Sequence, residues 1–125
     1  MNHARNPVGW FEIHVQDLDR GKSFYEKTFD LELTPLLNYG TEMLAFPGGP
    51  DGYGACGALV EGGSRTTGDD GTIIYFSCDD CAATAARAEK NGGKISQGKS
   101  AIGSWGFIAQ IVDLDGNMIG LHSLK

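Results

Sequence analysis

The chain has 125 residues, a formal net charge of −6 at pH 7 and an apolar fraction of 41%. This size suits one domain with a packed interior, and no run of about 18 apolar residues exists that could span a membrane. No cluster of Lys and Arg occurs, so nucleic acid is not an expected partner. Residues 1–10 lack a hydrophobic signal segment, and we expect a cytoplasmic protein.

The first half of the sequence predicts one helix and four strands. Residues 10–15 alternate in the manner of a half-buried strand, with Trp10, Glu12 and His14 on one face. Asp17 can cap a helix over residues 18–29, where bulky residues recur at helical spacing. Three strands follow, at 31–37, 41–46 and 55–61, and Pro35 marks the first of them as an edge strand.

The same order of elements returns in the second half. A polar, glycine-rich segment leads to a strand at 72–78, and Asp79 or Asp80 caps a helix at 81–91, which Gly92 ends. A short edge strand at 94–97 comes next. The chain closes with a hairpin whose strands, 106–113 and 118–123, are joined by a turn rich in Asp, Asn and Gly.

The sequence therefore repeats the pattern strand, helix, strand, strand, strand. The caps Asp17 and Asp79 lie 62 residues apart (79 − 17), which is half of the chain. Each half is too small to bury both faces of a four-stranded sheet. We expect an α+β fold, one domain over residues 1–125, in which two βαβββ modules (8–61 and 71–124) pair curved mixed sheets around a cavity. The pairing can occur within one chain or across a homodimer.

Three segments of this sequence resemble a known superfamily. They are FEIHVQDLDRGKSFYEKTF near the start, YFSCDD with RAEKNGGK in the second half, and DLDGNMIGLHS at the end. Together they resemble the vicinal oxygen chelate superfamily of glyoxalase I, bleomycin-resistance proteins and extradiol dioxygenases, over residues 9–123. The glyoxalase-related branch looks nearest. The resemblance implies paired βαβββ modules and a divalent metal that is chelated by a substrate with two adjacent oxygens.

The metal ligands of that superfamily are replaced in this chain. The first-strand ligand, His or Gln, falls on Trp10, and the last-strand ligand, Glu, falls on Gly120. The fourth-strand position falls near Ala55 or Gly57, and the fifth-strand position falls on Ile73. None of these side chains binds a divalent cation. We therefore predict no metal cofactor at the standard site.

Polar residues beside the lost ligand positions are the candidate site residues. Glu12 or a histidine would act as a general base next to a carbonyl, and Tyr75 or His122 would donate a hydrogen bond to the developing oxygen. Gln110 and Trp105 extend this cavity lining. The predicted catalytic residues are Glu12, His122 and Tyr75, and the predicted substrate-binding residues are Trp10, His14, Trp105 and Gln110.

Several functions stay open at this stage. The first is a glyoxalase-like lyase or isomerase that acts on a small oxygenated substrate without the standard metal ligands. The alternative is a non-catalytic protein that binds a small molecule or an antibiotic. Glu12, His14 and His122 also allow a displaced two-histidine, one-carboxylate site for a divalent metal, or a purely structural role. A mostly aromatic cavity favours the binding protein, whereas converging hydrogen bonds among the polar residues favour the enzyme.

Aromatic residues form the second group of candidates. Trp10, Phe46, Tyr53, Trp105 and Phe107 could line a wall for a flat or cationic ligand. Core packing is the interpretation that we favour for Phe46 and Phe107. Trp105 follows a glycine in a predicted loop and is the better ligand candidate.

The cysteines are only a weak indication of a metal site, a redox site or a disulfide. Cys78 and Cys81 are separated by two aspartates at a helix start, where the pKa of a thiol is lowered. The acidic neighbours oppose this effect, and a single CxxC pair is a weak sign of a metal or redox site. The chain has three cysteines, an odd number, so we expect no disulfide framework.

Overall fold

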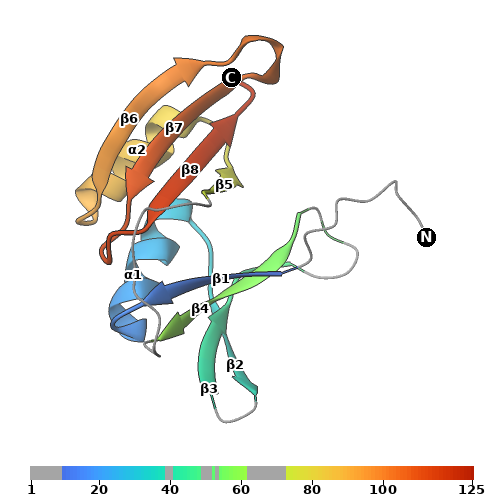
Figure 1. The fold of residues 1–125 in the computed structure, drawn as a ribbon, viewed down its shortest axis with the longest axis vertical. Helices are drawn as coiled ribbons and strands as arrows, with labels where there is room; N and C mark the ends of the chain where they lie inside the picture. The colour runs from blue at the N-terminus through green and yellow to red at the C-terminus, as the bar shows by residue number, and fades with distance from the viewer. Residues whose placement is uncertain (1–9, 39–40, 49–51, 53, 62–72) are drawn as a thin grey trace.

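A computed structural model of the chain describes residues 10–38, 41–48, 52, 54–61 and 73–125 (Figure 1). The first half holds β1 (Trp10–Val15), α1 (Leu18–Phe29), β2 (Thr34–Asn38), β3 (Thr41–Ala45) and β4 (Cys56–Glu61). The second half holds β5 (Ile74–Ser77), α2 (Cys81–Lys90), β6 (Lys94–Ala101), the 3-10 helix η1 (Gly103–Trp105), β7 (Phe107–Val112) and β8 (Met118–Ser123). Neither described helix is long and apolar enough to cross a membrane.

The eight strands form two separate sheets of the same design (Figure 1). Sheet A has the strand order β1-β4-β3-β2, and sheet B has the order β5-β8-β7-β6. In each sheet the outermost pair, β1 with β4 or β5 with β8, is parallel, and the other pairs are antiparallel. The α+β fold with two βαβββ units is therefore confirmed, and Pro35 lies on an edge strand as predicted.

The helices α1 and α2 are each capped by an aspartate, and each covers one face of its own sheet. The Asp17 carboxylate accepts a hydrogen bond from the Arg20 amide, and the Asp80 carboxylate accepts one from the Ala82 amide. Of the two aspartates that the sequence allowed as the cap of α2, the structure selects Asp80. The helices α1 and α2 also pack against each other, between the two sheets.

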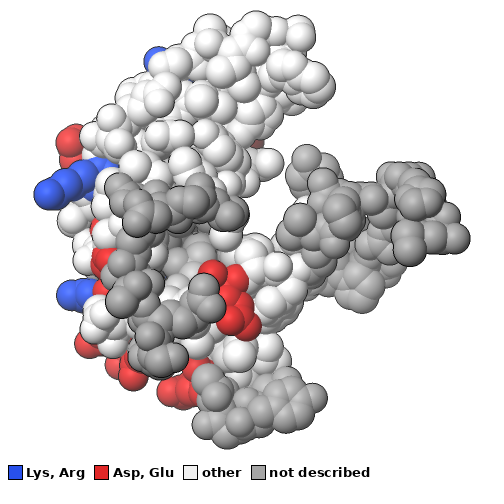
Figure 2. Space-filling model, viewed as in Figure 1, with Lys and Arg blue, Asp and Glu red and all other residues white. Residues whose placement is uncertain are grey.

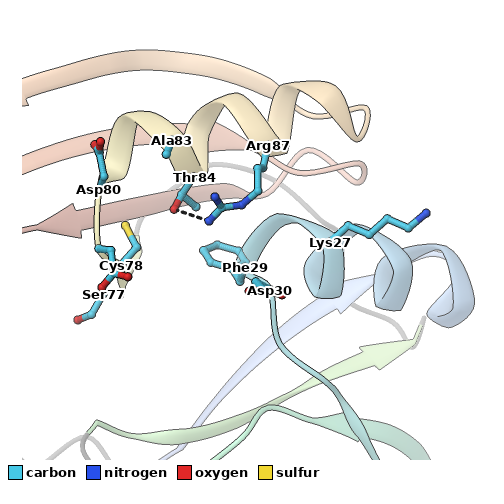
Figure 3. Close-up of a pocket in the computed structure, with 10 residues that line it drawn as sticks. Lys27, Phe29, Asp30, Ser77, Cys78, Asp80, Ala83, Thr84 and Arg87 are labelled. Carbon is cyan, nitrogen blue, oxygen red and sulfur yellow. Dashed lines mark hydrogen bonds between the residues drawn. The ribbon is translucent and has the colours of Figure 1, made fainter.

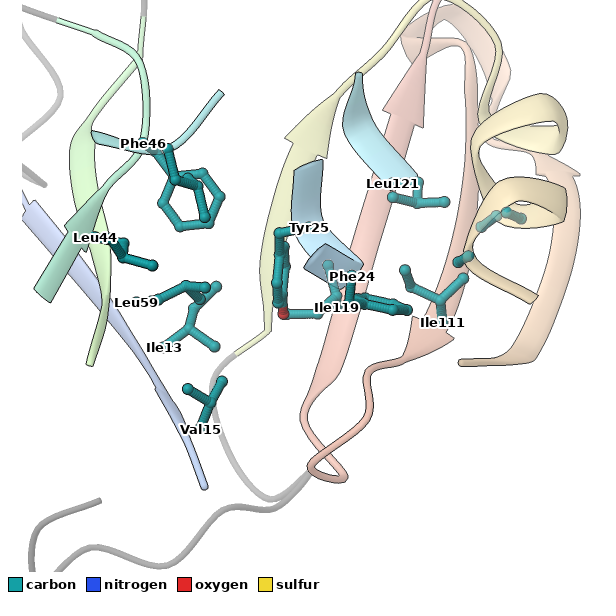
Figure 4. Packing of buried hydrophobic residues seen from close by; sticks show 14 of the residues in the cluster. Ile13, Val15, Phe24, Tyr25, Leu44, Phe46, Leu59, Ile111, Ile119 and Leu121 are labelled. Atoms are coloured by element: carbon teal, nitrogen blue, oxygen red, sulfur yellow. The ribbon is translucent and has the colours of Figure 1, made fainter. Parts of the chain in front are cut away.

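One hydrophobic core joins both sheets through the helices (Figure 4). The ring of Phe76 on β5 lies 6.0 Å from Phe11 and 5.6 Å from Phe46 of the other half, measured between ring centroids. The inner faces of the two sheets are thus turned toward the shared core. Among the described strands the two sheets do not close around a cavity, so the expected pairing of their other faces does not occur within one chain.

The turn after β7 fastens the second half of the chain to the first. The buried Asp113 carboxylate accepts hydrogen bonds from the Tyr25 hydroxyl and from the amides of Asp115 and Asn117, each at 2.8 Å. The Asn117 side chain donates to Asp113 and to the His14 carbonyl. Burial, followed by the neighbouring Asp113, raises the pKa of Tyr25 well above its ordinary value of 10.0.

Two predicted strand boundaries were wrong by three residues or more. The strand β6 extends over Lys94–Ala101 rather than over 94–97, because it pairs with β7 through register shifts that tolerate its polar, glycine-containing sequence. The strand β2 begins at Thr34 rather than at residue 31. Neither difference changes which faces the strands present.

Candidate functional site

No described helix packs on the face of each sheet that lies opposite its own helix, and we call these two surfaces the open faces. On β1 the side chains of Ile13 and Val15 are buried in the core, so Trp10, Glu12 and His14 lie on the open face of sheet A. In Figure 1 the helix α2 lies behind sheet B, and the view is onto its open face. Figure 2 shows this part of the surface largely in white, without a charged patch.

On sheet A, the three predicted residues form one connected group. Trp10 is 44% exposed, and its indole Nε1 donates a hydrogen bond to Glu12 Oε2 at 3.1 Å. Glu12 Oε1 lies 3.8 Å from His14 Nε2. His14 Nδ1 is buried and has no hydrogen-bond partner among the described residues. The group thus combines a fixed aromatic ring with a carboxylate and an imidazole.

On sheet B, a tyrosine ring lies flat over a glycine. Tyr75 is 43% exposed, and its hydroxyl accepts a hydrogen bond from Gln110 Nε2 at 2.8 Å. Tyr75 pairs in register with Gly120, and a Cβ atom at position 120 would lie only 2.3 Å from the ring. Gly120 is therefore needed to let the tyrosine ring cover the strand.

The imidazole of His122 is hydrogen-bonded to the loop that carries Trp105. Its Nε2 donates to the Trp105 carbonyl at 2.7 Å. The tip of this loop is closed by a hydrogen bond from the Ile102 amide to the Gly106 carbonyl at 2.9 Å. Trp105 itself is 76% exposed, so a constrained loop presents its indole to solvent.

The seven predicted site residues therefore fall into two groups on different sheets. Trp10, Glu12 and His14 belong to sheet A; Tyr75, Gln110, His122 and the adjoining Trp105 belong to sheet B. Within the ranges that the structure describes, no hydrogen bond or ion pair joins the two groups. The hydrogen bonds that would converge on one reacting centre are not formed inside a single chain.

The remaining aromatic candidates have separate positions. Phe46 is buried in the core, as predicted. Phe107 packs against the core, and the Lys99 ammonium lies 4.7 Å from its ring centroid. Tyr53 lies outside the described residues.

The described residues of one chain do not fit a divalent metal. No cluster of three or more His, Cys, Asp or Glu side chains that could hold an ion occurs in the described parts of the chain. Glu12 and His14 are neighbours, but His122 lies on the other sheet and its Nε2 is occupied by the Trp105 carbonyl.

The three cysteines are free thiols, and the pKa of Cys78 is raised rather than lowered at this helix start. Burial is the largest influence on this thiol and raises its pKa, although hydrogen bonds from its surroundings oppose the effect. Cys78 Sγ donates to the His122 carbonyl at 3.4 Å, and Cys81 is fully buried. Cys78 therefore lacks the lowered pKa of a catalytic thiol, but it is only partly buried, so an alkylating reagent can reach it at alkaline pH.

Sequence reasoning missed a pocket of 510 Å³ that lies where α1 ends and α2 begins (Figure 3). We call it the junction pocket. The CxxC segment contributes Cys78, Asp79 and Asp80 to it, but the sequence did not indicate a pocket there. Its walls come from segments about 50 residues apart that only the packing of α1 on α2 brings together. Its lining residues are Lys27, Phe29, Asp30, Ser77, Cys78, Asp79, Asp80, Ala83, Thr84 and Arg87.

Comparison with known proteins agrees with this architecture. Residues 7–121 match the family described as the Glyoxalase/Bleomycin resistance protein/Dioxygenase superfamily. Comparison with curated proteins finds no match.

Three solved structures illustrate what the chain resembles. TnmS3, an antibiotic binding protein from Streptomyces sp. CB03234, is 26% identical, with a TM-score of 0.69 and 98% of each chain covered. A glyoxalase/bleomycin resistance protein from the same strain is 25% identical, with a TM-score of 0.69 over 93% of this chain and 99% of that chain. A glyoxalase-related enzyme from Fulvimarina pelagi is 15% identical and shares the fold, with a TM-score of 0.71 over 95% of this chain and 88% of that chain.

Proposed function

Because the chain belongs to the Glyoxalase/Bleomycin resistance protein/Dioxygenase superfamily, we propose that it is a small-molecule-binding protein whose ligand lies against the open faces. One observation carries this proposal. The exposed aromatic residues Trp10, Tyr75 and Trp105 lie on or beside these faces. Hydrogen bonds hold the side chains of Trp10 and Tyr75, whereas the bond from His122 holds only the backbone of Trp105. Aromatic rings that are fixed before binding lose little entropy when a ligand stacks on them.

The chemistry of the two faces favours a flat ligand with a positive charge. A cation is attracted both to the face of an indole and to a neighbouring carboxylate, and Trp10 with Glu12 supplies this combination. The uncharged face of sheet B supplies Tyr75 for stacking. The likeness to an antibiotic binding protein, at 26% identity over 98% of both chains, supports binding as the activity.

A second copy of the chain would complete the site. Each open face carries only part of the aromatic and polar set, and β1 and β5 are end strands whose outer edges are unpaired among the described strands. We propose a homodimer in which the open face of sheet A in one copy meets the open face of sheet B in the other, with the ligand between them. In each copy the modules 8–61 and 71–124 remain one domain, because a single core joins them.

Mixing two defective variants tests this arrangement. Trp10→Ala and Tyr75→Ala each remove one wall from both sites of a homodimer, so both variants should lose binding of the planar cation 9-aminoacridine. After unfolding and refolding together, random pairing restores an intact site in heterodimers, which amounts to about a quarter of the wild-type number of sites. Recovery in calorimetry supports the shared site. Monomers in sedimentation, or dimers without recovery, contradict it.

A specific observation also supports an enzyme as the second candidate. Glu12 Oε1 lies 3.8 Å from His14 Nε2, and His14 Nδ1 is buried without a described partner, so a carboxylate and an imidazole stand side by side on the open face of sheet A. A lyase or isomerase would use Glu12 as the base, with Tyr75 of a second copy donating to the oxygen.

Deuterium exchange separates the enzyme from the binding protein. Hydroxyacetone has two adjacent oxygens, and its incubation with the protein in D₂O reports proton removal next to its carbonyl by NMR. The binding proposal predicts no exchange above that of Glu12→Gln. Fast exchange that Glu12→Gln abolishes, with an unchanged melting temperature, would make the protein an enzyme instead.

A further inference from the structure

The junction pocket contains none of the seven predicted site residues, yet it has an ordered cationic group. Arg87 Nε donates to the Thr28 carbonyl at 2.8 Å, and its Nη2 donates to Thr84 Oγ1 at 3.1 Å. These two bonds fix the guanidinium between α1 and α2, beside Phe29 (Figure 3). An arginine has five N–H donors, so three of them have no partner among the described residues. A planar guanidinium with free donors is suited to bind a carboxylate in two-point fashion.

The pocket also contains carboxylates, and they differ in how they are used. Asp80 caps α2 and accepts a hydrogen bond from Lys99 Nζ at 3.1 Å, and these bonds lower its pKa, the one from Lys99 most strongly. Asp30 and Asp79 line the same pocket, and neither carboxylate has a hydrogen bond or ion pair in the described part of the chain. Two acceptors for a cation are therefore free beside the fixed Arg87.

The remaining walls leave room for an apolar group. Phe29 and Ala83 line the pocket, whereas the Lys27 side chain points away from Arg87 in Figure 3. The volume of 510 Å³ lies within the range of about 300–1,000 Å³ that is usual for small-molecule sites.

We propose that the junction pocket is a second binding site and that it takes a small zwitterion of the amino-acid type. The ligand carboxylate bonds to Arg87, its ammonium group pairs with Asp79 or Asp30, and its side chain lies against Phe29 and Ala83. Because the walls come from both modules, the ligand stabilises the contact between α1 and α2.

Three probes that each carry a phenyl group test which charged groups the pocket recognises. L-phenylalanine is the zwitterion, 3-phenylpropionate lacks the amine, and phenethylamine lacks the carboxylate. The readout is alkylation of Cys78 by iodoacetamide, followed by peptide mass spectrometry, with the half-buried Cys56 outside the pocket as the internal reference. L-phenylalanine should slow alkylation of Cys78 several-fold relative to Cys56 and raise the melting temperature. Equal protection by all three probes, or none by L-phenylalanine, would overturn the proposal.

Charge-removing variants identify the partners. The double variant Asp30→Asn/Asp79→Asn should reduce protection by L-phenylalanine several-fold. Glu89 lies on α2 outside the pocket, so Glu89→Gln should leave protection unchanged. Arg87→Lys keeps the charge but removes the planar fork, and it should also reduce protection. If Arg87→Lys does not fold, the aspartate variants still decide the question, since their carboxylates bond to nothing in the described chain. Equal protection in the double aspartate variant and in Glu89→Gln would overturn the proposal. This outcome would not bear on the binding of 9-aminoacridine at the open faces, so the two proposals fail separately.

Discussion

The substitution Gly120→Ala tests whether the Tyr75 ring is set by the absence of a side chain beneath it. The added Cβ atom would lie 2.3 Å from Tyr75 Cδ2, so the ring must leave its place on β8. Tyr75 is 43% exposed and can turn into solvent, at the loss of its hydrogen bond to Gln110. That loss costs about 0.5–1.5 kcal/mol, and alanine recovers about 0.5 kcal/mol over glycine in a strand. The variant should therefore lie within about 1 kcal/mol of the wild type.

Gly57→Ala is the matched control, because its Cβ atom would also lie 2.3 Å from a ring, that of Phe11. Phe11 faces the core and contacts Phe46 and Phe76, so it cannot turn away without opening the core. Overpacking of this kind costs about 1–3 kcal/mol. Gly57→Ala should be less stable than Gly120→Ala by about 1 kcal/mol.

Urea denaturation measures both free energies of unfolding, and calorimetry with 9-aminoacridine measures binding. Gly120→Ala should lose most of its binding while it keeps most of its stability, because the Tyr75 ring is displaced from the open face. If Gly120→Ala is destabilised as strongly as Gly57→Ala, or if it binds 9-aminoacridine as tightly as the wild type does, Gly120 does not have this role.

Three further predictions concern the turn and the metal. Asp113→Asn should lower the free energy of unfolding by about 3 kcal/mol in urea denaturation, because an amide cannot accept all the hydrogen bonds that this buried carboxylate receives; a loss below about 1 kcal/mol contradicts this role. Since the pKa of Tyr25 is raised in the folded state, its stabilising contribution is complete below the unfolded value of about 10 and declines as the pH rises above it. The free energy of unfolding of the wild type should thus fall more steeply above about pH 10 than that of Tyr25→Phe. Parallel curves of unfolding free energy against pH would contradict this contribution of Tyr25. After equilibration with nickel, cobalt, manganese and zinc and then dialysis, mass spectrometry should find no stoichiometric metal in the wild type or in Gly120→Glu; metal that is retained and then lost in His122→Ala would establish a displaced site.

Local sequence patterns were sufficient to predict the two βαβββ units. Alternation over residues 10–15 assigned Trp10 and Ile13 to opposite faces, and the aspartate caps located both helices. These features depend on neighbours within a few residues, so they can be read from one sequence.

The packing of the two halves was not predictable in the same way. It depends on contacts such as Phe11 with Phe76, and on the hydrogen bond between Tyr25 and Asp113, which are 88 residues apart. The sequence predicted the turn around Asp113 but not that it fastens one module to the other.

The roles of individual site residues also depended on distant partners. Strand alternation placed His122 on the open face, but only the fold shows that it bonds to the Trp105 carbonyl. The junction pocket has no sequence signal because Arg87 acquires its orientation from Thr28, on the other helix.

The two tryptophans of the chain, Trp10 and Trp105, allow a direct test of whether a small molecule binds at the open faces. Their two indole N–H signals can be assigned in an NMR spectrum with Trp10→Phe and Trp105→Phe, and then followed during titration with 9-aminoacridine and with its mostly neutral analogue acridine. We predict saturable shifts of both signals, with tighter binding of 9-aminoacridine that Glu12→Gln weakens. If neither indole signal shifts with either compound, or if shifts occur only around the junction pocket, the account of the open faces is contradicted.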